Sequence, residues 1–497
     1  MDLMQEARKL VKNLQFRMSP SPYDIAWMAR LRDPATQSPR WPHLVQWLLE
    51  NQHADGSWGA KLVYYHDRII CTLIAAIALS ENGTGRDAED AIRRAEKYIW
   101  RNLHLLHTDP FELVGFELLF PTLIVEAQKL GLKVPNHAAG YDKIQIAKLR
   151  LIPPEMLYSP HATTKHSLEF LGRNADPTRI AQALGPNGSL GNSPAATTYF
   201  LMFGEHQPSL DYLNTSLAAT GLPLSLFPYR YFELTWMLNT LSYSQRPIKE
   251  FADEDIWQEL KGQFSDRGLG LDPTFNITDG DITSVTSRLL TEVGYEVDPM
   301  VLFRYQNPET RIFRTYPYER NMSIGTNVHA LEALCVLTDF PDRLNAQREV
   351  VSAILDRRIY NMYWMDKWHA SPYYATSHVL IGFLRFDSYL AHAARYTVDW
   401  LINTQRDDGS WGFFGEGTPE ETAYALTALL HLHRHEPVDS EMLRRGAAYL
   451  VRSYDLPQEG HAALWIYKCL CIMDDIVRAS ILAALILYED TCGPLPA

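Results

Sequence analysis

The sequence is short of positive charge, poor in cysteine and without a long apolar run. Lysine and arginine number 46 against 59 acidic residues, a net charge of −13, which disfavours nucleic acid or an anionic membrane as the main partner. The five cysteines include no CxxC pair, so neither a zinc site nor a disulfide framework is expected. No apolar stretch reaches the roughly 20 residues of a membrane span, and the N-terminal segment lacks the apolar core of a signal peptide. We therefore expect a cytoplasmic protein without stable membrane insertion.

Helical periodicity dominates what is present. Apolar residues recur three and four positions apart in the segments that begin at Tyr231, Thr283, Thr326 and Thr422, whereas alternating strand patterns are nearly absent. Hydrophobic residues make up 46% of the chain and charged residues 21%, enough for a large core, and 497 residues suit two or three domains. The pattern predicts an all-α fold of stacked helical hairpins that form barrels.

A short sequence is repeated within the chain. Residues 51–59 read NQHADGSWG and residues 404–412 read TQRDDGSWG, and a degenerate third copy begins at Gly185 with Leu190 in place of the tryptophan. The glutamine can cap neighbouring backbone while the tryptophan packs against the next helix. We interpret the repeats as structural staples between hairpins and not as catalytic groups.

These repeats resemble the QW motifs of triterpene and class II diterpene cyclases. The resemblance continues, in order and over almost the whole chain, in SPYDIAWMARL (21–31), HSLEFL (166–171), TNVHALEAL (326–334) and DKWHASPYYATSH (366–378). It is greatest to the bacterial branch that forms halimadienyl diphosphate, and looser to clerodane- and labdane-forming relatives. It implies two α/α barrel domains called β and γ and no class I α domain. Residues 1–20 then hold the first helix of β, 21–205 the inserted γ domain, and 206–497 the remainder of β.

The stretch Asp279-Gly280-Asp281-Ile282 occupies the position of the family's D-x-D-D motif. The resemblance implies that Asp281 is the general acid that protonates an alkene, with Asp279 as its supporting carboxyl. Burial raises the pKa of a carboxyl group and a second carboxylate nearby raises it further, so such a pair can hold a shared proton at neutral pH. Ile282 replaces the last acid of the motif and removes any hydrogen bond that the acid would make.

A carbocation cascade needs a dry pocket with aromatic walls, because water quenches the cations and aromatic faces stabilise them. The candidates for these walls are Trp236, Trp368, His369, Tyr373 and Phe413. Plant relatives carry a histidine base where this chain has Leu234, so the terminal base is unassigned.

A diphosphate needs cations or Mg²⁺, above all in an acidic protein. The resemblance implies Lys468 as a diphosphate contact and Glu169 as a Mg²⁺ ligand in the γ domain. Asp474-Asp475 begins a stretch like the class I D-D-x-x-D motif, but Arg478 stands where the third acid belongs, so metal-triggered ionisation is not expected.

The expected function is class II cyclisation of geranylgeranyl diphosphate to a bicyclic halimane-, clerodane- or labdane-type diphosphate. A phosphatase or a class I synthase would then act on the product. For the oligomeric state, a homodimer is one option. One alternative is the same chemistry on farnesyl diphosphate, giving a drimane. Others are a zinc-dependent prenyltransferase-like subunit and, because of Ile282, a non-catalytic isoprenoid-binding protein.

Overall fold

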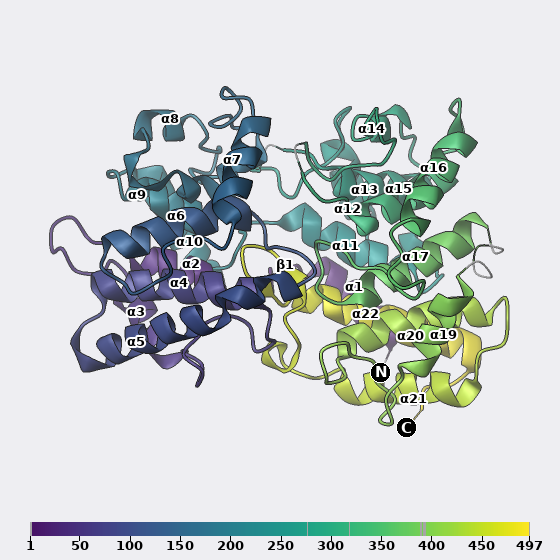
Figure 1. The fold of residues 1–497 in the computed structure, drawn as a ribbon. Coiled ribbons are helices and arrows are strands. Elements are labelled where there is room, and N and C mark those ends of the chain that lie inside the picture. The colour runs from purple at the N-terminus through teal and green to yellow at the C-terminus, as the bar shows by residue number, and fades with distance from the viewer. Residues whose placement is uncertain (1, 276, 318, 388–389, 391–393, 497) are drawn as a thin grey trace.

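The computed structural model describes residues 2–275, 277–317, 319–387, 390 and 394–496, and its regular secondary structure is almost entirely helical (Figure 1). Its α-helices are α1 (Leu3–Lys12), α2 (Pro22–Ala29), α3 (Pro42–Glu50), α4 (Tyr65–Asn82), α5 (Gly85–Asn102), α6 (Phe116–Lys129), α7 (Tyr141–Leu151), α8 (Pro177–Ala181), α9 (Pro194–Leu201), α10 (Gln207–Thr220), α11 (Arg230–Ser242), α12 (Glu254–Gln263), α13 (Gly280–Glu292), α14 (Met300–Phe303), α15 (Ile324–Val336), α16 (Arg343–Leu355), α17 (Pro372–Phe386), α19 (Arg395–Asn403), α20 (Pro419–His433), α21 (Ser440–Ser453) and α22 (Asp474–Cys492). Short 3₁₀ helices are η1 (Leu103–Thr108), η2 (Thr163–Asn174), η3 (Ile248–Glu250) and η4 (Gln458–Gly460). Strands β1 (Trp465–Ile466) and β2 (Leu470–Cys471) form an antiparallel hairpin.

The first group of helices closes into a ring. Helix α2 packs on α4, α4 on α6, α6 on η2, η2 on α9, and α9 returns to α2, while α3, α5, α7, α8 and α10 lie outside. Asp24 helps to close this ring, because its carboxylate accepts from Ser21 Oγ at 2.7 Å and from the backbone N–H of Ala195 at 2.8 Å. The ring forms the left half of the molecule in Figure 1.

A second ring consists of α11, α13, α15, α17, α20 and α22, each packed on the next and α22 on α11. These inner helices are buried on nearly all sides, as a helix enclosed by others must be, and α12, α16, α19 and α21 cover them. Helix α1 packs on α22 and α11 with one apolar face, so the start of the chain lies against the second ring. The prediction of two helical barrels is confirmed. Among the described residues, no helix combines the length and apolar content that crossing a bilayer needs.

The repeated tryptophans act as staples, as interpreted from the sequence. The indoles of Trp58, Trp364 and Trp411 are fully buried, and each donates to a backbone carbonyl ten residues earlier at 2.8, 2.7 and 2.8 Å. Their backbone N–H groups donate to a threonine hydroxyl of the following helix at 2.9–3.0 Å. Leu190 keeps this backbone bond, to Thr197 at 2.9 Å, without the indole. The copy at Trp364 escapes sequence comparison because its surroundings have lost the D-G-S-W-G spelling.

The β1–β2 hairpin lies between the two rings (Figure 1). Tyr467 of its turn accepts from the backbone N–H of Val114 in the first half at 2.9 Å, and Leu470 donates to Asp67 at 2.8 Å. On the other side, the Ile466 N–H donates to the carbonyl of Trp368 at 2.9 Å. The hairpin therefore ties both rings together.

Candidate active site

A cavity of about 290 Å³ opens between the two rings and takes its walls from both. From the side of the first ring come residues of α6, η2 and the outer helix α7, from the side of the second come residues of α11, the start of α13 and α17, and the hairpin lies between them. Most of the lining is apolar or aromatic: Leu118, Ile152, Met156, Leu226, Phe232, Trp236, Leu271, Phe275, Ile277, Ile282, Trp368, Tyr374, Trp465 and Ile466. Such a chamber suits a long hydrocarbon chain.

The two aspartates meet this cavity at the start of α13. Asp279 is the N-cap of the helix, where Oδ1 accepts from the Ile282 N–H at 2.6 Å and Oδ2 accepts from the Tyr316 hydroxyl at 3.0 Å. Only glycine fits between the two aspartates, because a Cβ on residue 280 would lie 2.1 Å from the carbonyl oxygen of Arg314. Burial, reinforced by the neighbouring Asp281 charge, raises the pKa of Asp279 to about 8.

Asp281 has a partner that the sequence reasoning missed. Nδ1 of His329, on α15, lies 2.6 Å from Oδ1 of Asp281, and both side chains are buried. Burial disfavours the imidazolium, but the Asp281 carboxylate outweighs it and raises the pKa of His329 above its ordinary value. Among the described contacts, no hydrogen bond joins the carboxyl groups of Asp279 and Asp281. The close pair at this site is thus an acid and an imidazole.

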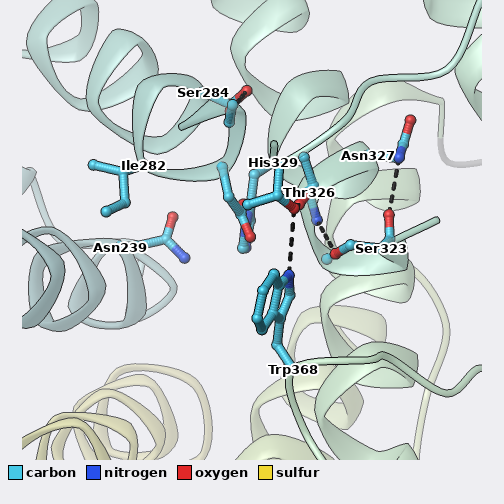
Figure 2. A network of polar contacts seen from close by, with 12 residues as sticks. Asn239, Ile282, Ser284, Ser323, Thr326, Asn327, His329 and Trp368 are labelled. Atoms are coloured by element: carbon cyan, nitrogen blue, oxygen red, sulfur yellow. Dashed lines mark hydrogen bonds and ion pairs between the residues drawn. The ribbon is translucent and has the colours of Figure 1, made fainter. Parts of the chain in front are cut away.

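Two of the predicted wall residues line the cavity. Trp236 stacks on Phe232 with ring centroids 4.7 Å apart. The indole of Trp368 donates to Thr315 Oγ1 at 3.3 Å, and Figure 2 shows it directed toward Thr326, with Ile282 at the other side of the view. Ile282 lines the cavity, so the position without its acid is a piece of apolar wall.

The other three predicted wall residues do not reach the cavity lining. His369 is buried behind it, with Nε2 3.2 Å from Glu420. Tyr373 stacks on Trp400 at 4.7 Å, on the outer side of α17, while its neighbour Tyr374 takes the place at the wall. Phe413 is 43% exposed. We therefore replace these three by Tyr374, Phe232 and Trp465.

Three basic side chains, each near a carboxylate, gather where the cavity meets solvent, at what we call its cationic end. Lys148, Arg320 and Lys367 line this end and are partly exposed. Each lies near a carboxylate, and the closest N–O distances are 3.8 Å to Glu117, 2.9 Å to Glu112 and 2.5 Å to Glu319. They come from three separate segments of the chain, so no sequence motif predicts that they lie together.

Glu169 and Lys468 bind each other. The Lys468 Nζ donates to Glu169 Oε1 at 2.6 Å and to Ser193 Oγ at 2.8 Å, and the Tyr23 hydroxyl donates to the same Glu169 oxygen at 3.1 Å. Both side chains are fully buried and neither lines the cavity. An ammonium group already neutralises this carboxylate, and the described residues contain no cluster of three or more ligating side chains. The residues around Glu169 therefore do not fit a Mg²⁺ ion.

The missed residues left only a weak signal in the sequence. His329 interrupts the apolar run of TNVHALEAL, and a histidine on a helix that is otherwise buried must find a polar partner. Which partner it finds depends on the packing of α15 against α13, which the sequence does not state.

Comparison with known proteins shows the family to which this chain belongs. The squalene-hopene cyclase C-terminal domain family matches residues 322–462. A type B diterpene cyclase of Mycobacterium tuberculosis is 32% identical, over 95% of this chain and 96% of the relative. An ent-copalyl diphosphate synthase of a Streptomyces species is 31% identical over 94% and 92% of the two chains. The solved ent-copalyl diphosphate synthase from Streptomyces platensis superposes with a TM-score of 0.79 and 28% identity, over 98% of this chain and 99% of that one.

The two relatives match more than nine tenths of the chain, the solved structure shares its fold, and the start of α13, with its two aspartates, lines an aromatic cavity. This protein is a member of the class II diterpene cyclase family.

Proposed function

We propose that this protein cyclises geranylgeranyl diphosphate to a bicyclic diterpenyl diphosphate, with Asp281 as the proton donor. The observation that carries the proposal is the buried Asp281–His329 pair at the wall of an aromatic cavity. An isolated alkene is a poor base, so it accepts a proton only from a strong acid held against it in the absence of water.

The Asp281–His329 geometry supports an acid of this kind. His329 occupies Oδ1 of Asp281, which leaves Oδ2 to carry the proton that is transferred. An imidazolium at 2.6 Å stabilises the carboxylate that remains after the proton is transferred. The raised pKa of Asp279, about 8, favours its neutral form at neutral pH, so it adds little negative charge beside the donor.

Protonation of the terminal alkene places a cation on the adjacent carbon, and the remaining alkenes attack in turn to form two fused rings. Trp236, Phe232, Tyr374 and Trp465 present aromatic rings around this path. A desolvated cation–aromatic contact is worth about 2 kcal/mol or more, which favours folding of the chain against these faces. Because the reaction begins by protonation of an alkene, the C–O bond to the diphosphate is not broken and the diphosphate is retained in the product.

For the diphosphate we propose the cationic end of the cavity, where Lys148, Arg320 and Lys367 lie. This replaces the contact at Lys468 inferred from the resemblance, because Lys468 is enclosed with Glu169 away from the cavity. The same pairing argues against Glu169 as a Mg²⁺ ligand.

The predicted domain limits also need one change. Helix α10 packs on α9 of the first ring. We therefore propose that the inserted domain runs from residue 21 to the connection between α10 and α11, instead of ending at 205.

The test is to incubate the purified protein with geranylgeranyl diphosphate, and separately with farnesyl diphosphate, then dephosphorylate and identify the alcohols. A bicyclic alcohol from the C20 substrate is the expected result. Linear geranylgeraniol alone would refute the proposal, and a drimane as the main product would shift it to the C15 substrate.

A further inference from the structure

A buried carboxyl group lies directly behind the aromatic wall of the cavity and takes no part in the steps derived above. Glu420, at the start of α20, is 2% exposed and does not line the cavity itself. Its Oε1 accepts from the indole N–H of Trp465 at 2.8 Å, and Trp465 does line the cavity. We propose that Glu420 makes the face of the Trp465 ring more negative, so that this ring stabilises the carbocations of the cyclisation more strongly. The proposal rests on the proposed function, since it concerns the cations that this reaction forms.

Three donors converge on Oε1 of Glu420. Besides the Trp465 indole, the Tyr424 hydroxyl lies at 3.0 Å and Nε2 of His369 at 3.2 Å. The backbone N–H of Ser371 donates to Nδ1 of His369 at 3.2 Å, so Nδ1 carries the lone pair and Nε2 carries the hydrogen. All three groups therefore donate, and hydrogen bonds of this kind stabilise the ionised form of a carboxyl group.

The Glu420 carboxylate has no fixed positive partner among the described residues. Its one ion-pair contact is His369, whose ring is neutral in the tautomer given above, and neither a lysine nor an arginine lies within 4.0 Å. By contrast, the buried carboxylate of Glu169 has an ammonium group, that of Lys468, at 2.6 Å. A buried carboxylate without a cation costs free energy. A carbocation formed in the cavity would supply the positive charge that this carboxylate lacks.

The indole of Trp465 can transmit the negative charge to the cavity. An indole N–H donates in the plane of its ring, so the bond to Glu420 does not cover a face of the ring. The face of an aromatic ring carries a negative potential, and an anionic acceptor on the N–H shifts electron density toward the ring and makes this potential more negative. A cation near the face is then stabilised more strongly. The ring is also held in place, because His369, Tyr374 and Phe232 pack against it at centroid distances of 5.3, 5.5 and 6.0 Å.

Glu420 is thus a positioning residue that acts through Trp465, while Asp281 still provides the proton. Loss of the negative charge should alter the fate of the cations and leave their formation in place. Cations that are less well stabilised lose a proton early or are captured by water. The products are then monocyclic or hydroxylated diphosphates, at the expense of the bicyclic alkene.

Glu420→Gln removes the charge and keeps an amide oxygen for the Trp465 N–H. We expect the ratio of the wild-type bicyclic product to monocyclic and water-trapped products to fall about fivefold or more, while KM changes little. Glu421→Gln is the matched control, because Glu421 is 1% exposed on the same helix but accepts from the Ser371 and Thr418 hydroxyls instead of from a residue of the cavity wall. The control should keep the wild-type product ratio.

A double-mutant cycle shows whether the charge acts through the indole. Trp465→Phe removes the N–H, so Glu420→Gln should change the product ratio far less in that variant than in the wild type. An equal change in both backgrounds overturns the proposal, and so does a wild-type product ratio from the folded Glu420→Gln variant. Thermal melting of each variant shows that it is folded before products are compared.

A fluorinated tryptophan incorporated at position 465 alone gives the answer if the Glu420→Gln protein does not fold. Fluorine keeps the N–H and nearly the same shape but withdraws electron density from the ring, so the bicyclic share must fall in the same direction. An unchanged product ratio contradicts the role of the ring and with it that of Glu420. A wild-type protein that forms no cyclic diphosphate would instead overturn the proposed function itself, and this role of Glu420 with it.

Discussion

His329 and Asp281 meet with 2.6 Å between Nδ1 and Oδ1, although they lie 48 residues apart and on different helices. Both side chains are shielded from solvent, at 1% and 4% exposure. A buried carboxyl group beside an imidazole is an acid whose strength depends on the charge of its neighbour. The first two predictions concern this pair.

Asp281→Asn should slow cyclisation strongly while leaving the cavity intact. Asparagine keeps the shape of the side chain and an acceptor for His329, but it has no proton to give. We expect the rate of cyclisation to fall by about 10²–10⁴, the usual worth of a general acid. Single-turnover assays with geranylgeranyl diphosphate measure this, and undiminished bicyclic product from the variant would exclude Asp281 as the donor.

His329→Gln should lower kcat and leave KM nearly unchanged, because His329 acts through Asp281 and not on the substrate. An amide can donate to Oδ1 but cannot carry a positive charge, so the acid is weakened but still oriented. We expect kcat to fall by about one to two orders of magnitude, and the pH profile of kcat to lose the contribution of an imidazole. A fall in melting temperature with an unaltered pH profile would reduce His329 to a structural role.

Asp279 should make stability depend on pH. Its pKa is about 8 in the folded protein against an ordinary value of 3.8, so between these values the folded state holds a proton that the unfolded chain releases. Stability from this group is complete below about pH 4 and is lost as the pH rises through 8. Asp279→Asn keeps a good N-cap that cannot ionise. Urea unfolding across this range should show a steeper decline for the wild type, and parallel curves for the two proteins would contradict the raised pKa.

Lys148→Met should weaken substrate binding without changing the product. A charge-assisted hydrogen bond is worth about 1.5–3 kcal/mol, so we expect KM to rise about tenfold or more. Lys143→Met is the matched control, because Lys143 lies on the same helix but is exposed and away from the cavity. Equal KM values for the two variants would remove Lys148 from the diphosphate site.

The Glu169–Lys468 pair should matter for folding and not for binding. Glu169→Gln or Lys468→Met alone leaves a charge buried without its partner, which costs about 3–5 kcal/mol of stability. The double variant should recover most of this loss, and thermal melting of the three variants measures it. A Lys468→Met protein with unchanged melting temperature and a strongly raised KM would restore Lys468 as a diphosphate ligand.

The sequence predicted the helices and the acid motif because both are local. Apolar spacing marks each buried helix, and Asp279-Gly280-Asp281 lies within a single turn. Trp236 and Trp368 were likewise recognisable from the motifs around them. Tyr373 and Tyr374 show the limit, since adjacent residues on a helix point about 100° apart and only the packing of α17 decides which one faces the cavity.

The remaining residues of the site depend on contacts between distant segments. The cationic end brings together Lys148 of α7 with Arg320 and Lys367 of two loops in the second half of the chain. His329 gains its role only because α15 packs against α13. Glu169 and Lys468 each look like ligand-binding groups when considered alone. Their separation of 299 residues conceals that each neutralises the other.

The β1–β2 hairpin lends the reaction chamber Trp465, Ile466 and Tyr467, yet it contributes neither the acid nor the cations at the solvent end. We therefore expect substitutions in this hairpin to change the shape of the cavity in which the hydrocarbon chain folds, and with it the ring skeleton of the product, while the initial protonation is unaffected.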